Sequence, residues 1–117
     1  MKSTIYHNSR CSKSRECLTI LNDLNEVIEV VNYLIKPLTS NEIKHILDLL
    51  QVEPEGIIRK NEAIFKEHYS NKNLTRSEWI DAIVKYPILL ERPIIIKGNK
   101  AIIGRPPEKI LEFLSND

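Results

Sequence analysis

Residues 3–33 read STIYHNSRCSKSRECLTILNDLNEVIEVVNY, and this stretch decides which fold the sequence predicts. Residues 3–6 form a short candidate strand. Residues 12–24 carry apolar side chains at positions 17, 18, 21 and 24, which is the spacing of one helix face. Residues 27–33 are rich in β-branched side chains and follow the helix closely, as the second parallel strand of a βαβ unit does. The stretch therefore predicts strand, helix and parallel strand.

The central part of the chain predicts helices without strands. Thr39 and Glu42 have the spacing of a capping box, in which each side chain bonds to the other residue's backbone N–H at a helix start. Thr75 and Glu78 repeat this pattern ahead of a second apolar helix face, and a proline ends that helix. Residues 39–86 are therefore expected to be helical, with turns between the helices.

The last part of the chain predicts a hairpin and a helix. Residues 93–106 read PIIIKGNKAIIGRP, in which Gly98 and Asn99 separate two β-branched runs. This pattern predicts two antiparallel strands joined by a two-residue turn with glycine first. Pro106 and Pro107 suit the first turn of a following helix. The apolar face of that helix would carry Ile110, Leu111 and Leu114.

This order of elements predicts an α/β fold with a four-stranded mixed sheet. A helical insertion between strands two and three, at about residues 38–87, accommodates the central segment. The chain has 117 residues, which is close to the commonest size of a domain. We therefore expect a single domain over residues 1–117.

The charge balance narrows the function classes. The chain has 17 Lys and Arg residues against 16 Asp and Glu residues, so it lacks the broad positive surface of a dedicated nucleic-acid binder. The N-terminus does not resemble a signal peptide, and no apolar run approaches the roughly 18 residues of a membrane span. We expect a cytoplasmic protein that binds neither nucleic acid nor a membrane.

Cys11 is surrounded in sequence by basic residues, which is unusual for a buried, inert cysteine. It lies at the predicted helix start, where free backbone N–H groups favour a thiolate. Arg10, Lys13 and Arg15 add positive charge nearby, and His7 could add more or accept a proton. This pattern predicts a reactive thiol at Cys11.

Cys17 lies on the apolar helix face and is expected to be buried. If the segment between the cysteines is helical, their Cα atoms are about 9 Å apart along the axis, too far for an unstrained disulfide. Ser14 stands where a redox dithiol has its second cysteine, which excludes a self-contained dithiol cycle. Cys17 also stands where the C-x5-R loop of the low-molecular-weight phosphatases has arginine. No spacing of Cys and His matches a zinc site, so we expect no metal.

Four segments in this order resemble the glutaredoxin-coupled arsenate reductase family. They are YHNSRCSKSR (6–15), IIRKNE (57–62), YPILLERPIII (86–96) and IIGRP (102–106). Each segment alone is weak, but the four in this order and spacing are specific to the family. The resemblance covers nearly the whole chain, and it implies a thioredoxin-like fold with a helical insertion.

The resemblance also assigns roles to particular residues. The family's nucleophile corresponds to Cys11, and its loop histidine corresponds to His7. Its three anion-binding arginines correspond to Arg59, Arg92 and Arg105. Guanidinium groups suit this role because a tetrahedral oxyanion and a thiolate repel each other, and bidentate donors offset that repulsion.

The resemblance further implies a cis peptide bond before Pro93, which would face Cys11. Glu91 beside it is interpreted as a surface carboxylate. Ser14 is consistent with electrons that arrive from outside, and it could donate a hydrogen bond to the Cys11 sulfur. The implied reaction is attack of Cys11 on arsenate. Glutathione or another external thiol acts as co-substrate, glutaredoxin or another thiol donor is the partner, and no cofactor is bound.

Two other functions fit this sequence. The first is a non-enzymatic redox regulator of the Spx type, which shares the fold and binds RNA polymerase. Such regulators typically carry C-x-x-C, and Ser14 counts against that interpretation. The second is a generic thiol reductase that acts on glutathione mixed disulfides. An arsenate-dependent assay with glutathione and glutaredoxin distinguishes these functions.

Overall fold

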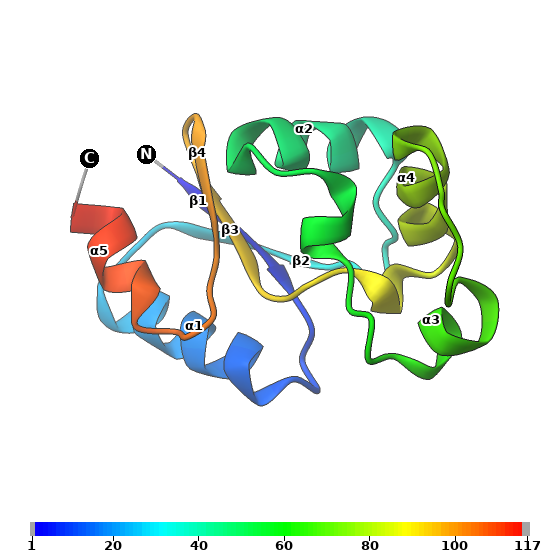
Figure 1. Cartoon of the computed structure of the whole chain (residues 1–117). Coiled ribbons are helices and arrows are strands. Elements are labelled where there is room, and N and C mark those ends of the chain that lie inside the picture. Colours follow the sequence, from blue (N-terminus) through cyan, green and yellow to red (C-terminus); the bar gives the residue numbers. More distant parts are fainter. Residues whose placement is uncertain (1, 116–117) are drawn as a thin grey trace. The chain divides into compact units, whose positions relative to one another are not determined.

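The computed structural model describes residues 2–115, and these form two compact units (Figure 1). Unit 1 comprises the described residues of Met1–Lys36 and Arg92–Asp117. Unit 2 is the continuous segment Pro37–Glu91. The predicted insertion at about 38–87 thus falls within unit 2. Within the described residues, every helix is too short or too polar to span a lipid bilayer.

Unit 1 contains a four-stranded mixed sheet, as predicted. Its strands are β1 (Ser3–His7), β2 (Ile28–Asn32), β3 (Ile94–Lys97) and β4 (Lys100–Ile103), in the order β2-β1-β3-β4. β1 pairs in parallel with β2 and antiparallel with β3, and β3 pairs antiparallel with β4. The predicted βαβ unit and hairpin are therefore both confirmed.

Two helices cover one face of this sheet. They are α1 (Ser12–Asp23) and α5 (Lys109–Ser115), which lie side by side in Figure 1. The core that joins them to the sheet consists of fully buried side chains from β1, α1, β3 and α5: Ile5, Cys17, Leu21, Ile95 and Ile110. Full burial of one such aliphatic side chain contributes roughly 1.5–3 kcal/mol, so this face anchors α1 firmly on β1.

The C-terminal helix begins later than the two prolines predicted. Residues 106–108 form a tight turn in which Lys109 and Ile110 donate to the carbonyl groups three residues earlier, at 3.1 Å each. α5 starts only after this turn, at Lys109. The predicted apolar face is also partly wrong, because Leu111 is half exposed while Ile110 is fully buried.

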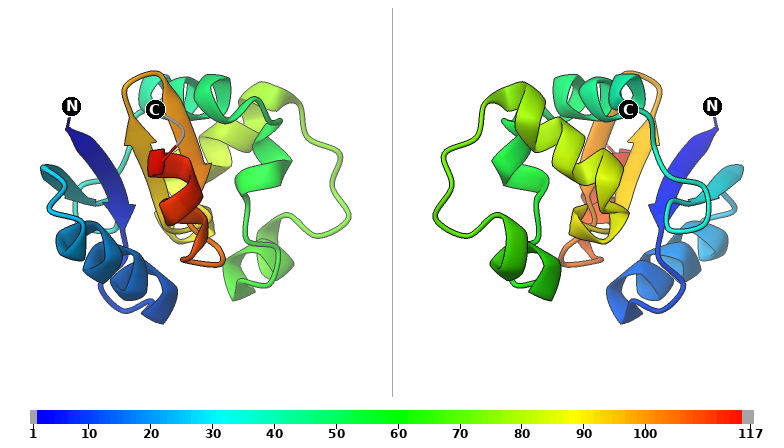
Figure 2. Two further views of the ribbon diagram at one scale, coloured as in Figure 1. Left: turned by 90° about the vertical axis from the view of Figure 1, so that its left-hand side faces the viewer. Right: turned by 90° about the vertical axis from the view of Figure 1, so that its right-hand side faces the viewer.

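Unit 2 consists of helices and connecting loops (Figure 2). Its elements are α2 (Ser40–Leu50), the 3-10 helix η1 (Pro54–Ile57), α3 (Ala63–His68), α4 (Arg76–Lys85) and the 3-10 helix η2 (Pro87–Leu89). Both predicted capping boxes are present, at the N-termini of α2 and α4. α4 packs against α2, η1 and η2, and its Trp79 ring stacks on Phe65 of α3.

Candidate active site around Cys11

Cys11 lies between the end of β1 and the first turn of α1. It is the N-cap residue of α1, with extended backbone angles (φ −94°, ψ 122°). Its side chain is half-buried. The sulfur is therefore placed at a helix N-terminus, where the orphan N–H groups of the first turn are available to it.

Asn8 holds the loop that carries Cys11. Its carbonyl accepts the Cys11 N–H at 3.0 Å, and its side-chain oxygen accepts the Arg10 N–H at 3.0 Å. Its own N–H donates to the Ser14 hydroxyl at 3.1 Å. The Arg15 guanidinium adds a bond of 3.0 Å to the Ser9 carbonyl. Sequence reasoning missed Asn8, although an asparagine at the first position of a turn is a recognisable turn signal.

The pKa of the Cys11 thiol is lowered, as expected from the sequence, and the N–H groups of the helix start contribute as predicted, but the cation is Arg92 and not a neighbouring basic residue. Partial burial alone would raise this pKa. The Ser14 backbone N–H, the hydrogen bond and charge of Arg92, and the Lys13 backbone N–H together outweigh burial, so the thiolate is favoured. The Lys13 amino group pairs instead with Glu16 at 3.5 Å. Arg92 is thus the cation that contacts the sulfur.

His7 and Ser14 form a buried pair behind Cys11. His7 Nδ1 and the Ser14 hydroxyl are 2.7 Å apart, and the hydroxyl also accepts the Asn8 N–H. Burial, with a smaller effect from the charge of Arg15, lowers the pKa of His7, so its imidazole is neutral near pH 7. Ser14 contacts the Cys11 sulfur through its backbone N–H. Its hydroxyl is bonded to His7 and Asn8 instead.

Arg92 and Arg105 are brought to the same end of the sheet by the β3–β4 pairing. Ile94 pairs with Ile103, and the Gly104 N–H continues this pairing with a bond of 2.9 Å to the Pro93 carbonyl. The Arg92–Pro93 bond is cis, which is the geometry that the resemblance implies, and the Arg105–Pro106 bond is also cis.

Gly104 allows β4 to end close to the middle of α1. A Cβ atom there would lie 2.7 Å from the Cys17 sulfur, 3.0 Å from Ile95 Cδ1 and 3.2 Å from Pro93 Cγ. The Cys17 thiol donates to the Gly104 carbonyl at 3.2 Å and is fully buried, as predicted. Burial, with smaller effects from nearby charges, raises the pKa of Cys17 to about 12. Cys17 is therefore an inert core thiol, and both cysteines are free.

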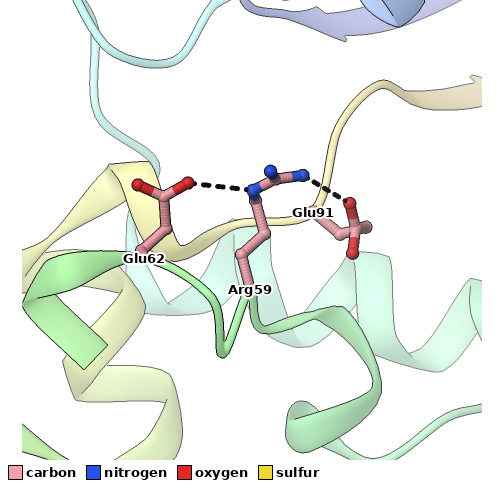
Figure 3. Close-up of polar contacts among 3 residues, drawn as sticks. All are labelled: Arg59, Glu62 and Glu91. Carbon is pink, nitrogen blue, oxygen red and sulfur yellow. Dashed lines mark hydrogen bonds and ion pairs between the residues drawn. The ribbon is translucent and has the colours of Figure 1, made fainter. Parts of the chain in front are cut away.

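Arg59, the third predicted anion-binding arginine, belongs to unit 2 and is held there by two carboxylates (Figure 3). Its Nε lies 3.2 Å from Glu62 Oε2, and its Nη1 lies 3.0 Å from Glu91 Oε1. The Glu91 side chain is only 23% exposed, so its interpretation as a surface carboxylate is wrong. Sequence reasoning missed both partners of Arg59.

The arrangement in unit 1 suits nucleophilic chemistry on an anion. A half-buried thiol with a lowered pKa lies against a guanidinium group, and a neutral histidine is bonded to Ser14, whose backbone N–H contacts the thiol. A thiolate attacks an electrophilic centre, while the guanidinium can bind the oxygens of that centre. The structure brings Cys11, His7, Ser14 and Arg92 together within this unit.

Comparisons with known proteins agree with this arrangement. The ArsC family model matches residues 6–113. An arsenate reductase from Haemophilus influenzae is 40% identical over 97% of this chain and 100% of its own length. An uncharacterized protein from Escherichia coli, YfgD, is 40% identical over 94% of each chain. The solved structure of an arsenate reductase from Vibrio cholerae is 35% identical, with a TM-score of 0.91 over 96% of this chain and 97% of that one. The chain belongs to the ArsC family and has its thioredoxin-like α/β fold.

Proposed function

We propose that the protein is a thiol-dependent oxidoreductase that reduces arsenate. The observation that carries this proposal is the contact between the Arg92 guanidinium and the Cys11 sulfur at the N-terminus of α1, where the pKa of the thiol is lowered. Relatives at about 40% identity are named arsenate reductases, which supports the choice of arsenate as the oxyanion.

In the first step, the Cys11 thiolate attacks the arsenic atom. A sulfur–arsenic bond forms, one arsenic–oxygen bond breaks, and the oxygen leaves as hydroxide, which takes up a proton to become water. Arg92 binds oxygens of the anion and offsets its repulsion by the thiolate. Neutral His7, anchored by Ser14, is suited to accept the thiol proton and pass it to the departing oxygen.

In the following steps, two external thiols supply the electrons. Glutathione replaces a second oxygen on arsenic, which leaves as water. Glutaredoxin or another thiol donor then attacks the glutathione sulfur, so that a disulfide forms and the electron pair of the sulfur–arsenic bond stays on arsenic. Water finally displaces Cys11 from arsenic, which releases arsenite and regenerates the Cys11 thiol. Overall, arsenate and two thiols give arsenite, one disulfide and water, so that arsenic gains the two electrons that the thiols lose. External thiols are required because Cys17 is buried and the position three after Cys11 is Ser14.

Arg105 and Arg59 are proposed as the further anion donors. Arg105 follows the end of β4, where the Gly104 N–H bonds to the Pro93 carbonyl beside Arg92. Arg59 is assigned to the anion by the family resemblance alone.

A coupled assay tests the function. The purified protein is incubated with arsenate, glutathione, glutaredoxin and glutathione reductase, and NADPH consumption is followed. We expect arsenate-dependent consumption that Cys11→Ser abolishes and Cys17→Ser retains, because the two thiols differ in exposure and pKa.

The same assay distinguishes the alternatives. If NADPH is consumed with a glutathione mixed disulfide as substrate and arsenate has no effect, the protein is a general thiol reductase and not an arsenate reductase. The absence of turnover with either substrate would refute the enzyme proposal and favour a regulator.

A further inference from the structure

A cavity of about 340 Å³ lies in unit 1, between the loop that carries Cys11 and the turn that follows β2. Its volume is at the lower end of the range for small-molecule sites, about 300–1,000 Å³. A protein partner docks instead over a broad surface, on the order of 800 Å². The cavity therefore fits a small molecule. Its walls come from two short segments of unit 1: Asn8, Ser9 and Arg10 on one side, and Asn32, Leu34 and Ile35 on the other.

The strand pairing places this cavity at the end of the sheet where Cys11 lies. β1 and β2 are parallel, and their last pair is His7 with Asn32. Both wall segments therefore stand at the carboxyl ends of neighbouring parallel strands. In open α/β sheets, ligands bind at this end of the strands.

The first wall and the nucleophile share one turn. The Cys11 N–H donates to the Asn8 carbonyl at 3.0 Å, which closes the turn over residues 8–11. The Asn8 side-chain oxygen accepts the Arg10 N–H at 3.0 Å, and Asn8 is only 4% exposed. Neighbouring Cα atoms are about 3.8 Å apart, and an extended peptide spans about 3.3–3.6 Å per residue. A ligand of tripeptide length that contacts Arg10 can therefore reach the Cys11 sulfur.

Arg10 gives this wall an exposed positive charge. Within residues 2–115, its guanidinium has neither a hydrogen bond nor an ion pair. The next two cations along the chain are engaged, because Lys13 pairs with Glu16 and Arg15 donates to the Ser9 carbonyl. A guanidinium binds a carboxylate through two parallel hydrogen bonds. Arg10 is therefore suited to bind a carboxylate of a ligand.

The opposite wall combines a fixed turn with exposed apolar side chains. The Asn32 carbonyl accepts the N–H groups of Ile35 and Lys36, at 3.1 and 2.9 Å. The Asn32 side-chain oxygen accepts the Leu34 N–H at 3.2 Å, and Tyr33 is fully buried. Ile35 is nevertheless 80% exposed and Leu34 is 37% exposed. Aliphatic side chains held in this way, opposite a cation, suit a ligand that has both aliphatic and anionic parts.

We propose that this cavity binds the external thiol of the reaction, as the anionic thiol peptide glutathione. The inference deepens the proposed function and rests on it, because it takes the co-substrate of that reaction as the ligand. An external thiol is needed since Cys17 is buried and Ser14 stands three residues after Cys11. A carboxylate of the peptide binds Arg10, its aliphatic part lies on Ile35, and its thiol is held close to the group with which it reacts.

Titration with S-methylglutathione, followed by nuclear magnetic resonance, tests binding without any chemistry. This analogue keeps both carboxylates of glutathione but has no free thiol to react. We expect saturable shifts of the amide signals of residues 8–10 and 32–35. Arg10→Ala should weaken binding roughly tenfold, the size of effect expected when a hydrogen-bonded charge pair is lost.

A charge pair at Ile35 tests the sign of the interaction. Because this side chain is 80% exposed, Ile35→Glu and Ile35→Lys should both fold, and both lose the same apolar contact. A glutamate at the mouth of the cavity repels an anionic ligand, whereas a lysine attracts it. We expect Ile35→Glu to bind S-methylglutathione at least about threefold more weakly than Ile35→Lys.

Lys36→Ala and Val27→Glu are the matched controls. Lys36 is exposed and adjoins the same turn, but it is not among the described residues that line the cavity. Val27 is an apolar residue that is 68% exposed and precedes β2, at the other end of that strand. Both variants should bind S-methylglutathione within about twofold of the wild type, because exposed charges away from the ligand are screened.

The kinetics separate binding of the thiol from reactivity of Cys11. The charge of Arg10 is not among the causes of the lowered Cys11 pKa, so Arg10→Ala should leave the nucleophile unchanged. In this variant, KM for glutathione should rise roughly tenfold. KM for arsenate should stay within about twofold. Arsenite formation with mercaptoethanol, a thiol without a carboxylate, should also stay within about twofold, because Arg10 has no group to bind on it.

Several results would overturn the inference while leaving arsenate reduction intact. Absence of saturable binding, or amide shifts outside the two wall segments, would mean that the thiol does not use this cavity. Unchanged binding by Arg10→Ala, or equal binding by the two Ile35 variants, would exclude the proposed contact with an anion. An equal rise in KM for arsenate would assign Arg10 to the oxyanion. In contrast, binding in the cavity by a protein that does not reduce arsenate would support the thiol site and refute the proposed function alone.

Discussion

Cys11 and Cys17 belong to the same helical segment, yet their surroundings shift the pKa values of the two thiols in opposite directions. Cys11 lies at the N-cap, half-buried, where backbone N–H groups and Arg92 outweigh burial and lower its pKa. Cys17 lies six residues later, fully buried, and its pKa is raised to about 12. The helix terminus and one distant arginine, rather than the local basic residues, separate a nucleophile from a core side chain.

The largest expected effect is a difference in alkylation between the two thiols. At pH 8, a thiol with a pKa near 12 is ionised to about one part in ten thousand, and only the thiolate reacts. In native protein treated with iodoacetamide, mass mapping should find Cys11 labelled and Cys17 unlabelled.

The pH dependence of that alkylation shows whether the pKa of each thiol is raised or lowered. The midpoint for Cys11 should fall below the roughly 8.5 of a free cysteine, because the folded state favours its thiolate. Cys17 should become reactive only after denaturation. Labelling of Cys17 first in native protein would reverse the assignment of the two thiols.

The next effect concerns the packing that keeps Cys17 buried. In Gly104→Ala, the added methyl group meets the Cys17 sulfur at 2.7 Å and Ile95 at 3.0 Å, in a fully packed core. We expect a loss of about 1–3 kcal/mol in the free energy of unfolding, measured by urea denaturation.

Gly56→Ala is the control for this substitution. Its Cβ would meet nothing closer than Val52 at 3.5 Å, so the stability should change little. In a Cys17→Ala background, Gly104→Ala should cost less than in the wild type, because the closest clash is gone. Equal cost in both backgrounds would mean that the sulfur is not what restricts position 104.

A smaller effect is expected at Cys11 when Arg92 is changed. Arg92→Ala removes both the hydrogen bond and the charge at the sulfur, so burial has more influence and the thiol pKa rises. We expect the alkylation midpoint of Cys11 to rise. Arg92→Lys should restore part of the shift, because an ammonium supplies charge without the planar fork.

Arg10→Ala is the matched control. Arg10 precedes Cys11 in sequence, but its charge does not figure among the causes of the Cys11 shift. If Arg10→Ala raised the alkylation midpoint as much as Arg92→Ala does, the local basic residues would be a cause of the lowered Cys11 pKa.

The parts of the fold that depend on local pattern were predictable. The capping boxes at Thr39 and Thr75 and the hairpin at Gly98 follow from short local spacings, and the βαβ unit follows from three consecutive local patterns. The start of α5 was missed, because two prolines can open a helix or form a turn, and the local pattern does not separate the two.

The site was predictable only in part. The contact of Arg92 with Cys11 depends on the pairing of β1 with β3, which spacing along the chain does not reveal, and it was the family resemblance that pointed to this arginine. Glu62 was missed because a glutamate three residues after an arginine is also common on solvated surfaces. The partnership of Glu91 with Arg59 depends on a backbone bridge between distant segments.

The smallest expected effect concerns Ser14. If the backbone controls the thiol, Ser14→Ala should leave the Cys11 pKa almost unchanged, because the Ser14 N–H that contacts the sulfur remains. The hydroxyl is engaged with His7 and Asn8, so its loss should instead lower the free energy of unfolding by about 1 kcal/mol, the typical net value of such bonds. The alkylation midpoint of Cys11 and the urea midpoint are measured on the same variant. A rise in the alkylation midpoint close to that of Arg92→Ala would show that the hydroxyl, directly or through His7, stabilises the thiolate. The difference in pKa between Cys11 and Cys17 would then depend on the Ser14 hydroxyl rather than on the N-terminus of the helix.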